Sequence, residues 1–135
     1  MIKLVGVEKT LGKQPVLRGV DLTIPTGKLT TIIGRSGEGK SVLLKHIIGL
    51  MQPDRGEVWI DGTNIARLKG QALNEVRKKF AMLFQGAALF DSMTVWENVA
   101  FALRRAKRPK DEIAARVAEC LEMVHLEGAE TKMPA

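Results

Sequence analysis

The sequence predicts an α/β protein in which an antiparallel β layer adjoins a core sheet flanked by helices. Residues 16–24 alternate apolar and polar side chains, which is typical of a half-buried antiparallel strand. Residues 29–33 form a more continuous apolar run, as expected of a central strand buried on both faces. A glycine-rich loop, residues 34–41, follows this run and leads into a helical pattern over residues 42–50. This order of strand, loop and helix predicts the fold class.

The chain before the core strand is predicted to form the antiparallel layer. Residues 2–8 indicate a first strand, and residues 9–15 indicate a turn or loop before the alternating strand. Residues 25–27, Pro-Thr-Gly, indicate a second turn. His46 lies in the helix after the loop, and we interpret it as a packed or surface histidine rather than a catalytic one.

The second half of the chain predicts short elements and then longer helices. A short strand is expected at residues 57–60, a short helix at 73–79 and another strand at 80–84. Thr94 is expected to cap a helix that runs to about residue 106. A last helix is expected from Asp111 to about His125.

Composition places the chain among soluble globular proteins. Its 135 residues suit one domain, and 45% of them are hydrophobic and 27% charged. No stretch approaches the roughly 20 apolar residues that a membrane-spanning helix needs. We therefore expect a cytoplasmic protein that reaches a membrane only through a partner. Cys120 is the only cysteine and is predicted to be a buried, inert thiol, which excludes an internal disulfide.

Charge is concentrated around the glycine-rich loop. The net charge is +6, and residues 1–50 hold 8 basic and 3 acidic side chains. Such an excess attracts anions. Nucleic acid is a disfavoured partner, because no block of lysine and arginine is interleaved with aromatic side chains. The densest basic run, residues 104–110, is interpreted as the solvated end of a helix.

The glycine-rich loop matches the phosphate-binding pattern G-x-x-x-x-G-K-[ST] at each fixed position. Glycines let the backbone turn and approach a ligand closely, and successive N–H groups then form a nest for an anion. The following helix presents its positive end to the same anion. The residues assigned to nucleotide binding are Gly34, Arg35, Ser36, Gly37, Glu38, Gly39, Lys40, Ser41 and Val42.

Three side chains of the loop carry specific expectations. Lys40 is expected to place a cation against the outer phosphates, and Ser41 to offer its hydroxyl to a Mg²⁺ ion that bridges them. Glu38 would bring a carboxylate close to a polyanion, so its side chain is expected to point to solvent.

A complete hydrolytic site is not predicted from this chain. Hydrolysis usually needs a second acidic group for the metal, often an aspartate that ends an apolar strand. Asp61 and Asp91 each follow an apolar run, but Asp61 stands in a turn and the run before Asp91 is short. Both are set aside as the metal acid.

In order and spacing these residues resemble the first half of an ABC-type ATPase, the nucleotide-binding subunit of membrane transporters. Residues 34–41 resemble its Walker A loop, and residues 53–58 with 61–62 its return to the antiparallel layer. Phe84-Gln85 resembles the Q-loop, with Gln85 placed 45 positions after Lys40. Residues 94–100 resemble the start of the helical subdomain.

The resemblance implies a P-loop NTPase fold with two parts. Residues 1–85 would form the nucleotide-binding core with the antiparallel β subdomain, and residues 86–135 would begin the helical subdomain. Gln85 would contact the Mg²⁺ or position the attacking water, and would sense the membrane partner. The cofactors implied are ATP and Mg²⁺. The partners implied are a transmembrane permease subunit and a second ATPase subunit in a homodimer.

A narrower likeness concerns residues 77–79, Arg-Lys-Lys, and residues 85–90, Gln-Gly-Ala-Ala-Leu-Phe. They resemble the ATPases of lipid transporters of the MCE (mammalian-cell-entry) type. This implies phospholipid transport at the bacterial inner membrane, peripheral attachment to the inner face of that membrane, and an MCE-type lipid-binding protein as a further partner.

The chain departs from the family pattern in two ways. Leu11 stands where the family commonly stacks an aromatic ring on adenine, and no aromatic residue precedes Gly34. Adenine would then pack on aliphatic side chains such as Leu11 and Val16. The family's signature motif, Walker B acids and switch histidine would follow residue 135, so the chain is expected to be C-terminally truncated. Alone, it is expected to bind ATP without turnover.

Two alternatives remain open beside the transporter subunit. The chain could be a non-catalytic nucleotide-binding module, or a soluble ABC-type ATPase that acts on DNA. The second class tends to place a long coiled coil after the Q-loop. Here two helical runs of ordinary length follow, without sustained heptads.

Overall fold

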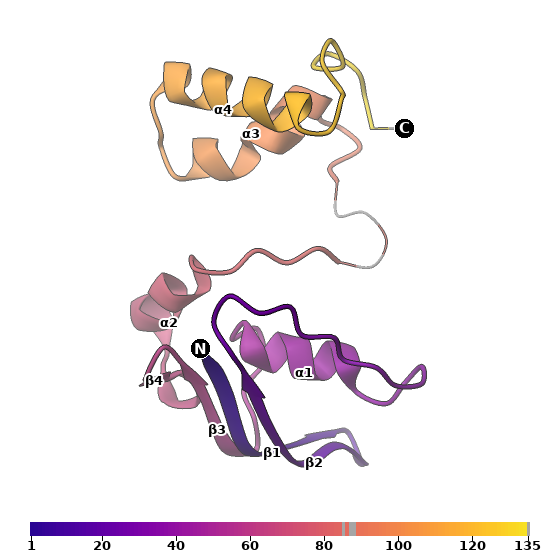
Figure 1. The fold of residues 1–135 in the computed structure, drawn as a ribbon, viewed down its shortest axis with the longest axis vertical. Helices are drawn as coiled ribbons and strands as arrows, with labels where there is room; N and C mark the ends of the chain where they lie inside the picture. Colours follow the sequence, from indigo (N-terminus) through magenta and orange to yellow (C-terminus); the bar gives the residue numbers. More distant parts are fainter. Residues whose placement is uncertain (85, 87–88, 135) are drawn as a thin grey trace. The chain divides into compact units, whose positions relative to one another are not determined.

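The computed structural model describes residues 1–84, 86 and 89–134 (Figure 1). The chain forms two compact units, Met1–Met82 and Leu83–Ala135, and each is described by itself. Gln85 lies outside the described residues.

The first unit is built on an antiparallel sheet with the strand order β2-β1-β3-β4. β1 (Ile2–Leu11) pairs with β2 (Gln14–Ile24) on one side and with β3 (Arg55–Ile60) on the other. β4 (Thr63–Asn64) extends the edge beside β3. The predicted antiparallel layer is therefore confirmed. The turn expected at residues 9–15 is shorter than predicted, because both strands of the hairpin continue into it.

Close packing of β1 on β3 depends on a glycine. Gly56 has a φ of +86°, which side chains rarely adopt, and a Cβ there would overlap the carbonyl group of Gly6. The register between the two strands shifts at the same place, between Val5 and Glu8. Gly56 thus allows the two backbones to meet at an irregularity of the sheet.

One helix covers a face of the sheet and places the loop before it. α1 (Lys40–Ile47) turns Leu43 and Ile47 into the core, as its apolar stripe predicts. A 3₁₀ turn, η1 (Ile65–Arg67), and α2 (Gly70–Arg77) complete the unit. The buried core consists of Leu4, Val7, Leu17, Leu43, Ile47, Val58, Ile60, Ile65 and Leu73.

Two predicted strands are absent from the described residues. Residues 29–33 and 80–84 are irregular, and neither pairs with a strand in the described part of the chain. Leu29 is 97% exposed, and Ile33 and Leu83 are each 90% exposed. A core strand requires hydrogen-bonding neighbours at its edges, and the antiparallel sheet supplies none to these segments. The sequence prediction of strands there is wrong for this structure.

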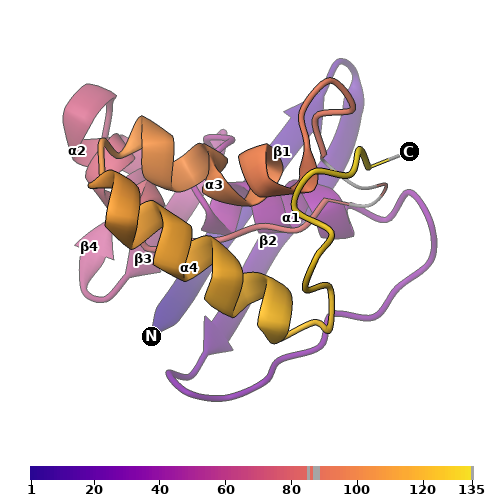
Figure 2. The ribbon, with the colours of Figure 1, turned by 90° about the horizontal axis from the view of Figure 1, so that it is seen from above.

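The second unit is a pair of helices (Figure 2). α3 (Val95–Arg105) and α4 (Lys110–Glu122) pack through a cluster that consists of Ala100, Ile113, Val117 and Leu121. Thr94 caps α3 as predicted: its side chain accepts a bond from the Glu97 N–H, and the Glu97 carboxylate accepts one from the Thr94 N–H. The C-terminal segment accepts a hydrogen bond from the first turn of α3: the Val95 N–H donates to the Lys132 carbonyl at 2.9 Å.

Two smaller expectations are tested in this unit. The basic run at residues 104–110 is exposed around the turn between the helices, which confirms the interpretation as a solvated helix end. Cys120 is half-buried rather than buried. It lies two residues before Glu122, where α4 ends.

Candidate phosphate-binding site

The glycine-rich loop ends where α1 begins. Gly39 is the N-cap of α1 and has left-handed dihedrals, φ 91° and ψ 7°. The first helical bond runs from Leu43 N to the Gly39 carbonyl at 2.8 Å. The N–H groups of the first turn, from Lys40 to Val42, have no partner within the helix and lie at its positive end. This geometry favours an anion at the end of the loop.

Lys40 reaches back over the loop. Its Nζ donates to the Gly34 carbonyl at 2.6 Å and to the Arg35 carbonyl at 2.5 Å. Both bonds tie the helix start to the first two residues of the loop, six and five positions earlier. The structure therefore brings the predicted cation to the beginning of the predicted phosphate loop.

Glu38 differs from its prediction. The residue is exposed, but its Oε2 accepts a hydrogen bond from the Arg35 N–H at 2.7 Å. The same oxygen lies 2.8 Å from the position that a Cβ on Gly34 would occupy. The carboxylate thus folds back onto the loop instead of pointing to solvent. The Arg35 N–H, at the start of the loop, attracts a carboxylate for the same reason that backbone N–H groups attract phosphate.

The loop is packed against β2. Gly39 is buried, and a Cβ there would meet Val16 Cγ1 at 2.8 Å and Leu17 Cδ2 at 3.3 Å. Val16, one of the aliphatic residues assigned to adenine, therefore contacts the loop. Leu11 lies at the end of β1, is 41% exposed and pairs with Gln14 across the hairpin.

Of the two residues expected to bind the metal, the structure describes one. Ser41 is exposed and lies in the first turn of α1. Gln85, the second expected metal contact, lies outside the described residues. Among the described residues no group of three or more His, Cys, Asp or Glu side chains is placed to hold a metal ion.

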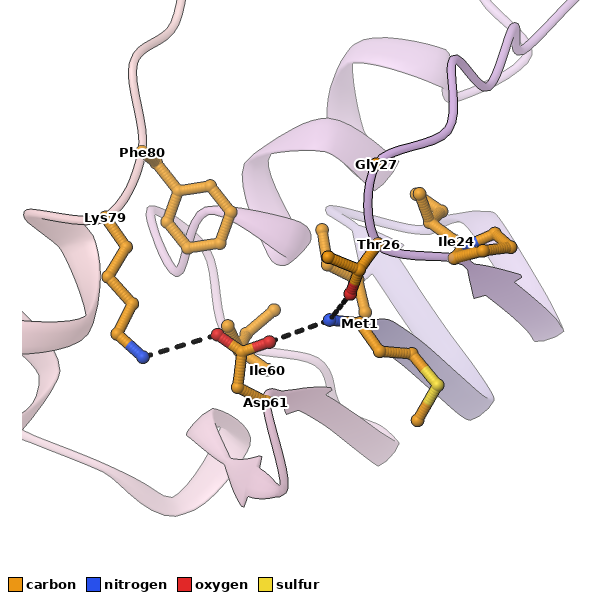
Figure 3. A pocket seen from close by; sticks show the side chains of 10 residues that line it. Met1, Ile24, Thr26, Gly27, Ile60, Asp61, Lys79 and Phe80 are labelled. Atoms are coloured by element: carbon orange, nitrogen blue, oxygen red, sulfur yellow. Dashed lines mark hydrogen bonds and ion pairs between the residues drawn. The ribbon is translucent and has the colours of Figure 1, made fainter.

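Asp61 belongs to a separate pocket of about 260 Å³ (Figure 3). Its Oδ1 accepts from the N-terminal ammonium at 2.7 Å, and its Oδ2 lies 3.3 Å from Lys79 Nζ. The hydrogen bond from the N-terminal ammonium, and then that from Lys79, lower the pKa of the Asp61 carboxyl. The ammonium also donates to Thr26 Oγ1 at 2.6 Å. Both carboxylate oxygens of Asp61 are thus paired with cations.

Sequence reasoning missed a contact at the other end of α1. Arg77 of α2 donates from Nη2 and Nε to the Gly49 carbonyl, at 2.6 and 3.2 Å. A cation at a helix C-terminus is favourable, so Arg77 stabilises the end of α1 opposite the loop. In the sequence Arg77 is one residue of a basic triplet, and this pattern does not indicate which carbonyl group it binds.

His46 of α1 is buried, so it is the packed histidine of the two predicted alternatives, packed or on the surface. It is 1% exposed, and its Nδ1 lies 2.7 Å from the Val42 carbonyl oxygen. It faces the core and not the loop, which agrees with its interpretation as a packed histidine.

Comparison with known proteins identifies the family. Residues 17–134 match the model of the ABC transporter family, so the chain belongs to the ABC transporter family. It resembles the ATP-binding cassette MJ0796, solved as a dimer in a post-hydrolysis state bound to ADP and Pi. The TM-score is 0.87 and the identity 34%, over 99% of this chain and 62% of that one. The predicted ABC-type fold is thereby confirmed.

Several curated proteins are similar in sequence. The probable ribonucleotide transport ATP-binding protein mkl of Mycobacterium tuberculosis is 44% identical over 98% of this chain and 37% of its own length. MlaF of Escherichia coli K12, an intermembrane phospholipid transport ATP-binding protein, is 40% identical over 100% and 51%. The methionine import protein MetN of Mesorhizobium japonicum is 41% identical over 100% and 37%.

The chain spans between about a third and a half of the length of these curated relatives. Among the described residues, no helix is both long and apolar enough to cross a membrane.

Proposed function

We propose that the chain binds Mg-ATP through residues 34–41 and serves as the ATP-binding subunit of an ABC transporter. The observation that carries the proposal is the loop itself: Lys40 Nζ lies against Gly34 and Arg35 while the free N–H groups of α1 face the same loop. Cation and amide donors converge where a polyphosphate would lie. Membership of the ABC transporter family supports ATP as that ligand.

The residues divide the binding between them. Lys40 would exchange its two carbonyl partners for phosphate oxygens, and Ser41 would hold the Mg²⁺ ion. Mg²⁺ supplies neutralisation of the charge that develops on the phosphates. Val16 and Leu11 would pack on the adenine, and Gln85 would contact the Mg²⁺ ion or the attacking water. Residues 1–135 alone would bind ATP without turning it over.

We further propose that the transported substrate is a phospholipid. The similarity to MlaF and the MCE-type residues at 77–79 and 85–90 support this substrate class. In the whole protein, a second ATPase subunit and a transmembrane permease would complete the machine at the inner face of the bacterial inner membrane. Hydrolysis would then drive lipid movement, with an MCE-type lipid-binding protein as a further partner.

The test is the affinity for Mg-ATP of a Lys40→Ala variant, measured by calorimetric titration. A charged hydrogen-bonding group contributes about 1.5–3 kcal/mol, so the variant should bind at least roughly tenfold more weakly. Lys45→Ala is the matched control, because Lys45 is a cation in the last turn of the same helix. An affinity of Lys40→Ala equal to that of the wild type, or an equal loss in both variants, contradicts the phosphate-loop assignment.

A further inference from the structure

The carboxylate of Glu38 occupies the loop that the proposed function gives to phosphate. Its Oε2 accepts the Arg35 N–H at 2.7 Å, and Lys40 Nζ is bound by the carbonyls of Gly34 and Arg35. The Glu38 carboxylate and the Lys40 ammonium therefore both lie at the first two residues of the loop, where one accepts from a backbone N–H group and the other donates to backbone carbonyl groups. Any polyphosphate that takes the Lys40 ammonium must approach the place where the Glu38 carboxylate lies.

Two features keep the carboxylate there. Gly34 provides the space, since Oε2 lies 2.8 Å from the point where a Cβ would stand. The positive end of α1 begins two residues after Glu38, at Lys40. The field that attracts a phosphate thus also attracts this carboxylate, and the two anions compete.

We propose that Glu38 determines which form of the nucleotide the loop accepts: it disfavours a free polyphosphate and leaves the magnesium complex as the preferred ligand. This inference rests on the proposed function. Like charges placed together are unfavourable, and the repulsion grows with the charge of the incoming group. Mg²⁺ neutralises the outer phosphates, so a Mg-bound nucleoside triphosphate meets less repulsion than the bare one.

The opposite role would be purely structural. If the bond from Arg35 only held the loop in shape, removing the carboxylate would loosen the loop and weaken binding of every nucleotide. Repulsion predicts the reverse sign, because removal of the charge tightens binding and does so most for the most highly charged ligand. The two roles are therefore separable by the direction of the change in affinity.

The experiment titrates ATP into wild type, Glu38→Gln and Glu38→Ala, once with excess Mg²⁺ and once with EDTA. Glutamine retains an oxygen that can accept the Arg35 N–H, so Glu38→Gln removes the charge with the least change in shape. Glu75→Gln is the control, since Glu75 is an exposed carboxylate of α2 whose partner is Lys78. Thermal unfolding of each variant checks that the fold is retained.

The expected result is a Kd for metal-free ATP that falls about tenfold in Glu38→Gln, with a smaller fall for Mg-ATP. The preference for the magnesium complex then shrinks, while Glu75→Gln leaves it unchanged. The difference between wild type and Glu38→Gln should decline at 1 M salt, where the Debye length is about 3 Å. ADP, with one phosphate fewer, should respond less than ATP.

An unchanged ratio of the two Kd values in Glu38→Gln, with Lys40-dependent binding intact, overturns this inference alone. Weaker binding by both Glu38 variants also overturns it and establishes the structural role. If wild type and all variants fail to bind ATP, the proposed function falls, and the inference falls with it.

Discussion

Replacing Gly39 by alanine tests how the phosphate loop is packed onto the sheet. Gly39 has a φ of +91°, and its buried Cα leaves no room for a side chain. A Cβ would stand 2.8 Å from Val16 Cγ1 and 3.3 Å from Leu17 Cδ2. Gly37 provides a matched control, because its φ is +82° and a Cβ there would meet nothing within 4 Å. Both substitutions strain the backbone, but only one also clashes with β2.

The two effects have different magnitudes. A left-handed conformation is unfavourable by about 1–2 kcal/mol for alanine, and the lower freedom of the unfolded chain offsets about 0.4–1 kcal/mol of this. Gly37→Ala should therefore destabilise the fold by about 1 kcal/mol. Insertion of an atom into packed neighbours adds typically about 1–3 kcal/mol. Gly39→Ala should then destabilise the fold by about 2–4 kcal/mol.

Equilibrium unfolding in urea, followed by the fluorescence of Trp59 in β3, measures both values in the unit that holds the loop. Because Trp96 of α3 also fluoresces, each variant is prepared with Trp96→Phe in the background. The prediction is a lower urea midpoint for Gly39→Ala than for Gly37→Ala at a similar slope. Equal midpoints for the two variants would refute the packing of the loop on Val16.

Two further predictions concern contacts outside the loop. The hydrogen bond from Lys9 Nζ, and then that from the Thr10 N–H, lower the pKa of the Asp54 carboxyl. The folded pKa is below the unfolded one, so this stabilisation is complete above the ordinary carboxyl pKa and is lost as the pH falls through the lowered value. Asp54→Asn should flatten the acid limb of a thermal-melt pH series, and an unaltered limb would contradict this. Thr94→Ala should destabilise α3 by about 1 kcal/mol in urea unfolding, whereas Thr94→Ser, which keeps the hydroxyl, should not; equal effects would exclude the cap to Glu97.

Local signals allowed the position of the loop and the helix after it to be predicted. Residues 34–41 carry fixed residue types whose backbone demands are strong, and Leu43 and Ile47 mark the buried stripe of α1. The cap at Thr94 was equally local, because its partner Glu97 lies three residues away. Each of these predictions depends on contacts within one turn or one loop.

Contacts between distant segments could not be predicted from the sequence. Arg77 binds a carbonyl 28 positions earlier, and Asp61 binds an amine 60 positions earlier. Nothing in the residue types at these positions specifies such partners. The prediction for Glu38 was wrong for another reason. Repulsion from a bound phosphate suggested that the Glu38 side chain points to solvent, whereas in the structure its carboxylate accepts a hydrogen bond from the Arg35 N–H.

The two missing strands separate burial from pairing. Ile32 and Phe80, one residue from each predicted strand, pack against the core of the first unit, so the apolar runs do carry information about burial. Leu29, Ile33 and Leu83 in the same runs remain largely exposed. An apolar run indicates that some of its side chains are buried, whereas a strand also requires hydrogen-bonding partners for its backbone. Within the described residues the sheet consists of β1 to β4 and includes neither run, so the apolar pattern could predict neither which of its side chains are buried nor the backbone hydrogen bonds that would order them.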